Sequence, residues 1–194
     1  MRLIRSLTRQ SIRFSAALFI TRKGRYNMAL KSVRQRRMQA NYLDIGTAEE
    51  ENFVLMGTGF TDLNEEPGAQ TSSKRYVNDA STSKGITGYE WQAPYTADQI
   101  RSEEAIAYIC EIGELLKTGA DAETDYVIVD LDQKESAENT YHARKFHVAI
   151  EVASFGNEDG EMNCEGNLLG IGDVVEGTFN TSTKKFTAKG DTPS

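Results

Sequence analysis

The sequence predicts a mainly β protein with one helix on its flank and one long loop between strands. Short apolar segments with two-residue alternation recur from Asn52 onward, which is typical of strands. Residues 102–119 follow helical periodicity instead. A glycine-rich and acidic stretch at 57–73 interrupts the strand pattern. The length of 194 residues suits one domain with a packed core.

The strongest strand signal lies in YHARKFHVAIEVASFG, residues 141–156. One set of alternating residues is apolar and the other is mixed, so we expect a long antiparallel strand with one buried and one wetter face. The apolar set is Phe146, Val148, Ile150 and Val152, and the mixed set is Lys145, His147, Ala149 and Glu151. Further strands are expected at 52–57, 74–79, 85–93 and 125–132. Within 85–93, the expected shared face consists of Thr87, Tyr89, Trp91 and Ala93.

The helix signal begins at Ser102, a good N-cap, and acidic residues follow in the first turn, where they suit the helix dipole. Lys117 and then Gly119 supply a stop. The apolar stripe at helical spacing comprises Ala105, Ile109, Ile112 and Leu116. A single amphipathic helix among strands is expected to lay such a stripe on a sheet.

The stretch 57–73 is predicted to be a loop because it holds three glycines, a proline and three acids among 17 residues. Loops of more than roughly 12–15 residues are uncommon in compact domains and are usually functional or mobile. Phe60 and Leu63 would be exposed in it unless something covered them. Two interpretations stay open: the loop folds back on its own core, or it docks on a neighbouring subunit.

Charge is distributed very unevenly along the chain. The first 27 residues contain seven basic residues and no acidic one, whereas the remainder has 15 basic and 29 acidic residues, a balance of −14. Such an acidic body does not suit a duplex DNA binder held by phosphate contacts. It suits a surface that nucleic acid passes without adhering, because like charges repel.

The basic extension 1–27 has three interpretations: a targeting segment, a functional basic tail, or sequence upstream of a natural start at Met28. We therefore place the domain at 28–194, with an N-terminal arm at 28–50 that includes the basic patch Lys31–Gln39. No apolar run reaches the roughly 20 residues that a membrane-spanning helix needs.

The glycine-rich segment 165–187 does not fit a phosphate-binding loop. A GxGxxG pattern would need glycine at position 175, where the chain has Val175, and no Gly-Lys-Ser/Thr follows. We expect its glycines to allow bends or close approach between strands of a hairpin. They are Gly166, Gly170, Gly172 and Gly177.

Catalytic and metal-binding patterns are weak. His142 and His147 are five positions apart on one strand and so face opposite sides. Asp130 and Asp132 share a face, which suits a cation site or acid–base chemistry, but solvated turn acids are the preferred interpretation. The two cysteines, Cys110 and Cys164, form no motif and are expected to be reduced apolar fillers in an intracellular fold. The sequence predicts no enzyme, cofactor or metal.

Several segments together resemble one family. In order they are MGTGFTDLNEEPGAQ, KRYVND, GITGYEW, TDYVIVDLD, ARKFHVAIEV and GNLLGIGDVVEGTFNTSTKKFT. From about Met28 to Lys189 their order and spacing are similar to those of the major tail tube proteins of tailed bacteriophages, particularly long-tailed phages and prophages of Gram-positive bacteria. The resemblance implies a tail-tube-like β-sandwich or barrel with a flanking helix and a long inter-subunit loop.

The resemblance also implies a function. Six copies would form a ring, and rings would stack into a hollow tube that delivers DNA to the host. Partners would be further copies of the chain and the tape measure, tail terminator and distal tail proteins. The protein would lie in the virion tail, after assembly in the host bacterial cytoplasm. The tube of a contractile injection machine is a close alternative, and a monomeric β-sandwich binding module is a more distant one.

Three groups of residues acquire roles from this resemblance. The contacts between subunits and rings fall to Gly59, Phe60, Leu63 and Pro67, within a ring-stacking loop at 58–72. The arm contributes Lys31, Arg34, Arg36 and Arg37. The candidate acids of the lumen are Asp130, Asp132 and Glu151.

Overall fold

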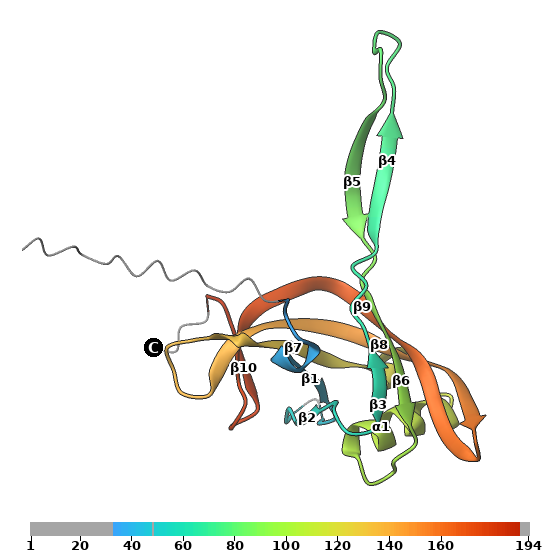
Figure 1. The fold of residues 1–194 in the computed structure, drawn as a ribbon, viewed down its shortest axis with the longest axis vertical. Coiled ribbons are helices and arrows are strands. Elements are labelled where there is room, and N and C mark those ends of the chain that lie inside the picture. The colour runs from blue at the N-terminus through green and yellow to red at the C-terminus, as the bar shows by residue number, and fades with distance from the viewer. Residues whose placement is uncertain (1–32, 48, 191–194) are drawn as a thin grey trace, which may run out of the picture. The chain divides into compact units, whose positions relative to one another are not determined.

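The computed structural model describes residues 33–47 and 49–190, and it confirms a mainly β fold with one α-helix (Figure 1). The extension 1–27 and Lys31 lie outside the described residues. All described strands and helices belong to one unit, Arg34–Ser194. The elements are η1 Arg36–Met38, β1 Gln39–Asp44, β2 Phe53–Leu55, β3 Phe60–Leu63, β4 Ala69–Lys74, β5 Ser83–Tyr89, β6 Gln92–Asp98, α1 Glu104–Glu114, η2 Gly119–Ala122, β7 Glu123–Lys134, β8 Thr140–Glu158, β9 Glu161–Asn180 and β10 Lys185–Ala188.

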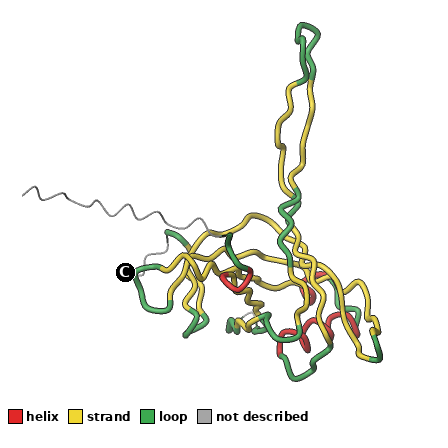
Figure 2. The backbone as a smooth tube through the Cα atoms, in the orientation of Figure 1, coloured by secondary structure: helices red, strands yellow, loops and turns green. Residues whose placement is uncertain are grey.

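Eight of the strands form one antiparallel sheet in the order β2-β1-β7-β8-β9-β6-β3, with β10 paired to β9. The two longest strands, β8 and β9, have 19 and 20 residues and pair along nearly their whole length. The sheet is strongly curved (Figure 2). The curvature brings Phe179 of β9 to 4.6 Å from Tyr42 of β1, measured between ring centroids, although two strands separate them in the sheet.

Helix α1 covers one face of the sheet, as the periodicity predicts. Phe146, Val148 and Ile150 of β8 are buried on this face in a core that also contains Ile106 and Ile109 of the helix. The alternation predicted for β8 is therefore confirmed, with Val152 packed at the margin of the core. A second core, which includes Tyr42, Phe53 and Phe179, lies on the opposite face, where the sheet curls upon itself.

The helix is shorter than its sequence signal. Its N-cap is Glu103, not the predicted Ser102, and no side chain caps it. At the other end Leu116 is 82% exposed and has a φ of +52°, so the predicted stripe loses its last member where the backbone turns left-handed. Ile106 and Cys110 are buried beside the remaining stripe and widen it.

The strand predictions between residues 57 and 98 were partly wrong. The predicted loop 57–73 contains β3 and most of β4, and the predicted strand 74–79 forms the tip of the β4–β5 hairpin. The predicted strand 85–93 is divided between two sheets, so Tyr89 is exposed whereas Ala93 is buried, and they share no face. Strand β6 was not predicted because Pro94 interrupts its pattern.

The predicted arm is also shorter than 28–50. Residues 39–44 form β1, which lies inside the sheet between β2 and β7, and Leu43 is fully buried. This strand has only six residues, directly after a basic patch, and three consecutive buried positions in place of an alternation, so the sequence did not separate it from the arm.

Close approach between strands explains two glycines of the 165–187 segment. A Cβ on Gly166 would lie 1.9 Å from the Glu151 carbonyl oxygen, and one on Gly177 would lie 2.3 Å from that of Thr187. The prediction of a hairpin region is confirmed by the pairing of β9 with β10. Cys110 and Cys164 are free and buried, as expected of apolar fillers.

Candidate assembly interface

The residues predicted for contacts between subunits do not form a loop. Leu63 is only 7% exposed in the chain's own core, and Phe60 is half-buried with its ring 6.4 Å from that of Tyr95. Gly59 directly precedes β3 and has a φ of +83°, and Pro67 is exposed near the base of the β4–β5 hairpin. Of the two interpretations of this stretch, the one in which it folds back on its own core is therefore correct for Phe60 and Leu63.

The β4–β5 hairpin, residues 69–89, is the exposed element of this region. It forms a two-stranded sheet of its own and stands away from the curved sheet (Figure 1). Its large apolar side chains are exposed, and they are Tyr76, Val77, Ile86 and Tyr89. Its basic side chains, Lys74, Arg75 and Lys84, are exposed as well. The hairpin thus offers apolar and cationic groups together.

A cluster of side chains fixes the base of this hairpin to β8. Arg144 donates two hydrogen bonds to the Glu65 carboxylate, at 2.6 and 3.0 Å, and Trp91 Nε1 donates a third at 3.0 Å. The Trp91 ring stacks on Phe146 with a centroid distance of 4.1 Å. Burial alone would raise the pKa of Glu65, but the hydrogen bonds from Arg144 and Trp91 outweigh it and hold that pKa below the ordinary value of 4.5. These contacts join both stems of the hairpin, because Glu65 precedes β4 and Trp91 follows β5.

The arm is anchored where it enters the domain. Arg34 Nη2 donates to Asp130 Oδ1 at 2.5 Å and to Asp132 Oδ1 at 2.9 Å. Asp130 is only 5% exposed, so the interpretation as a solvated turn acid was wrong for it. The reason is Arg34, 96 residues away in sequence, together with His142. Burial alone would raise the pKa of Asp130, but hydrogen bonds from Arg34 and His142 hold it below the ordinary value of 3.8.

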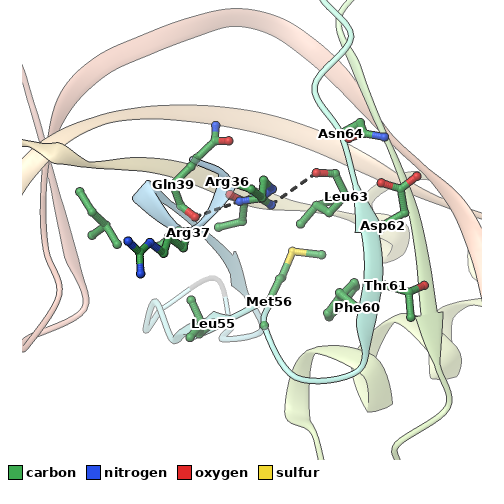
Figure 3. Close-up of a pocket in the computed structure, with 14 residues that line it drawn as sticks. Arg36, Arg37, Gln39, Leu55, Met56, Phe60, Thr61, Asp62, Leu63 and Asn64 are labelled. Atoms are coloured by element: carbon green, nitrogen blue, oxygen red, sulfur yellow. Dashed lines mark hydrogen bonds between the residues drawn. The ribbon is translucent and has the colours of Figure 1, made fainter. Parts of the chain in front are cut away.

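Arg36 and Arg37 lie at a groove of about 570 Å³ between β1, β2 and β3 (Figure 3). Arg36 spans it by donating to the Gln39 carbonyl at 2.9 Å and to the Leu63 carbonyl at 3.4 Å. Buried Asn41 also lines the groove, and its Oδ1 has no hydrogen-bond partner among the described residues. Arg36 thus connects the start of β1 to the edge strand β3.

The candidate lumen acids do not share one face. Asp130 lies on the same face of the sheet as Phe146, whereas Glu151 lies on the opposite face with Lys145 and Ala149. Asp130 is moreover buried and ion-paired, so it offers no free negative charge. Asp132, although exposed, is bound by the same arginine.

The face of the sheet that carries Glu151 is exposed to solvent along β6 and along the part of β9 that pairs with β6. Along β6 the buried residues alternate with half-exposed ones, and in β9 the same alternation runs from Asn163 to Leu169. The acids on this face are Asp62, Asp98, Glu151 and Glu165. Predicting this acidic surface from the sequence would have required the register of β6, and β6 was not predicted because Pro94 interrupts its pattern.

One stretch of β9 has an unpaired edge. Pairing with β6 ends at Leu169, pairing with β10 begins at Gly177, and the Glu176 carbonyl accepts a hydrogen bond from the Lys189 backbone, so no described strand pairs with the outer edge of residues 171–175, where the register with β8 also shifts. Ile171, Val174 and Val175 are exposed there. An open edge with apolar side chains is a site where another chain can add a strand.

The two histidines lie on opposite faces of β8, as predicted. His142 has ring nitrogens 3.2 Å from Asp130 and 3.4 Å from Glu176. His147 lies 2.9 Å from Asp125 and 3.5 Å from Glu123. Within the described ranges, no group of three metal-ligating side chains comes together. No helix there has the length and apolar character that crossing a membrane requires.

Comparison with known proteins identifies the fold. No family model matches the chain, and no curated protein matches it. Among solved structures, a chain from the virion of a native gene transfer agent (GTA) particle has a TM-score of 0.50, and a chain from the tail of an empty GTA particle with C6 symmetry has a TM-score of 0.51. Each is 11% identical, with 80% of this chain and 100% of the other covered. This protein therefore shares the fold of these chains from gene transfer agent particles.

Proposed function

We propose that this chain is a structural protein of a phage-type tail, in which hexameric rings stack into a hollow tube for DNA delivery. The observation that carries the proposal is the shared fold with a chain from a particle tail of C6 symmetry, covered over its full length. The sequence resemblance to major tail tube proteins supports the same function independently of that comparison.

Ring closure is supported by the open edge at residues 171–175 of β9. A heterologous contact between identical subunits closes into a ring when the rotation permits, and it covers edges that would otherwise promote aggregation. The exposed Ile171, Val174 and Val175 supply apolar area for such a contact. The chain therefore has a surface that assembly would bury.

A DNA-conducting lumen is supported by the open acidic face of the sheet. Glu151 remains a lumen candidate, and Asp98 and Glu165 join it in place of Asp130 and Asp132, whose carboxylates both bind Arg34. Carboxylates on this surface would repel phosphates and let DNA pass without adhering. Arg34, Arg36 and Arg37 would fix the start of an arm that reaches a neighbouring subunit, and the tape measure, terminator and distal tail proteins would be the other partners.

The test is direct observation of self-assembly. We expect the purified full chain, and the shorter chain 28–194, to form hollow rings or striated tubes in negative-stain electron microscopy, with matching mass in light scattering. A chain that stays single at high concentration and binds a glycan would instead support the binding-module function.

A further inference from the structure

The two cysteines of the chain lie in one core although they are far apart in the sequence. Cys110 is fully buried in α1, Cys164 is fully buried in β9, and both belong to the core between the helix and the sheet. The sequence contains no other cysteine. The proposed function gives this pair of nucleophilic side chains no role beyond filling space.

The packing of α1 on the sheet brings Cys110 over Cys164. Phe155 of β8 is the strand partner of Cys164. Gly113 lies one helical turn after Cys110 and therefore on the same side of α1. A Cβ on Gly113 would be 2.8 Å from Cζ of Phe155, so this side of the helix rests on the part of the sheet that contains Cys164. The two thiols are themselves in contact, because their side chains form a hydrogen bond with each other.

This environment holds both thiols in the protonated form. Burial raises the pKa of the Cys110 thiol, and it raises the pKa of the Cys164 thiol to about 12. The hydrogen bond between them favours the thiolate of Cys110 and disfavours that of Cys164, so the Cys164 thiol donates and Cys110 Sγ accepts. The charged groups near the pair are Arg101, which also favours the Cys110 thiolate, and the carboxylates of Glu114 and Asp98.

We propose that Cys110 and Cys164 form an intramolecular disulfide that fastens helix α1 to strand β9 when the chain meets an oxidising low-molecular-weight disulfide. Thiols in direct contact need only a small rearrangement to reach the S–S bonding distance of about 2.05 Å. The pair is therefore reduced in a reducing compartment and cross-linked in an oxidising one.

The reaction is two successive thiol–disulfide exchanges. The Cys110 thiolate attacks one sulfur of the small disulfide, which releases one small thiol and leaves a mixed disulfide on Cys110. Cys164 then loses its proton and attacks the Cys110 sulfur, which releases the second small thiol. The protein loses two electrons and two protons, and the small disulfide gains them. Because only a thiolate attacks, the raised pKa of Cys110 makes the first exchange slow at neutral pH.

The inference goes beyond the proposed function and does not depend on it. A disulfide restricts the unfolded chain and so stabilises the folded one. Here it would also hold α1 on the sheet, although no side chain caps the start of this helix. For a protein of a particle that leaves its host, the link would form after assembly, when the reducing environment is lost.

The experiment oxidises the folded full chain and locates the link. The chain is incubated with oxidised glutathione in the absence of denaturant, remaining thiols are blocked with iodoacetamide, and the product is digested with trypsin. We expect a monomer in non-reducing electrophoresis and one linked pair of peptides, 102–117 with 146–184, lighter by two hydrogens than the separate peptides. The rate of linkage should rise about ten-fold from about pH 7 to about pH 8, because the thiolate fraction does so below the pKa. Cys110→Ala and Cys164→Ala are the matched controls, and neither should form the link.

The oxidised wild type should have a Tm about 5–15 °C above that of the reduced chain, with slower hydrogen exchange in 104–114, and dithiothreitol should reverse both changes. Neither single-cysteine variant should show this shift on oxidation. A link that forms only in urea, a disulfide-linked dimer in place of the monomer, or an unchanged Tm would overturn the proposal. All these readouts are made on the single chain, so a failure to form rings or tubes would count against the proposed function alone.

Discussion

The β4–β5 hairpin and the curved sheet from which it emerges both consist of antiparallel strands, but they differ in burial and in charge. Strands of the sheet bury alternate side chains in two cores, whereas the hairpin strands bury none fully. The sheet is acidic and packs most of its apolar side chains in its own cores, and the hairpin is basic and exposed on both faces. The difference teaches that the packed cores of this fold and its exposed basic hairpin reside in separate segments, which can be altered separately.

The largest effect is expected when core packing is removed from the sheet. Leu168 of β9 is fully buried, so Leu168→Ala should lower the free energy of unfolding by about 2–5 kcal/mol, through lost transfer energy and a cavity. Ile86 of the hairpin is 60% exposed, and Ile86→Ala should change it by less than about 0.5 kcal/mol. Urea unfolding followed by circular dichroism measures both. Equal losses would mean that the hairpin belongs to the cooperative core.

The connection between the two regions should be weaker but measurable. Arg144→Ala leaves the half-buried Glu65 carboxylate without its bidentate partner, which should cost about 1–3 kcal/mol. Faster hydrogen exchange is expected in the stems at 64–68 and 90–92. The matched control is Arg101→Ala, whose pair with Glu114 is exposed and should contribute little to stability. Unchanged exchange in the stems of Arg144→Ala would show that the pair does not hold the hairpin.

Acid should weaken both the sheet and the attachment of the hairpin to it. Glu65, Asp125 and Asp130 all have pKa values below their ordinary ones, because hydrogen bonds from basic partners outweigh the effect of burial, which alone would raise them. For a lowered pKa the stabilisation is present above the unfolded-state value and is lost as the pH falls through the folded-state value. The free energy of unfolding should therefore fall as the pH decreases from about 5 to about 3.

Asp130→Asn should make this pH dependence shallower, since one of the three protonations no longer differs between the folded and unfolded states. Unfolding in urea at a series of pH values measures the slope. Asp132→Asn is the comparison, because it removes the second, exposed carboxylate bound by the same arginine. A slope that Asp130→Asn leaves unchanged would contradict the assignment.

Sequence periodicity was sufficient to predict the elements whose structure is determined by burial of one apolar face. The alternation around Phe146 and the stripe around Ile109 predicted a long strand and a helix that packs on it, and both are present. The hairpin was predicted only in part: residues 85–89 of β5 fall within an expected strand, whereas β4 was placed in the predicted loop because its residues are polar and exposed and carry no alternation. Strand β6 was concealed by Pro94 for a related reason: one residue of low strand propensity broke a short pattern.

The surfaces were harder to predict than the fold, because they depend on contacts between distant residues. Asp130 is buried through Arg34, which lies 96 positions away, and no local pattern indicates that pairing. The acids Glu151 and Glu165 share a face only through the register between β8 and β9. A charge count along the chain would have separated the basic hairpin from its acidic surroundings, and that signal was available in the sequence.

The smallest effect is expected from filling space in the hairpin. A Cβ on Gly85 of β5 would meet no atom within 4 Å, and the backbone there is not left-handed, so Gly85→Ala should be accommodated without strain. Alanine restricts the unfolded chain and should stabilise the ribbon by about 0.4–1 kcal/mol. If the hairpin opens independently of the sheet, this gain slows hydrogen exchange in 69–89 by about two- to five-fold, while the global free energy of unfolding stays the same. A matching increase in global stability would instead show that the two regions unfold together, and the separation between them would then lie in burial and charge alone.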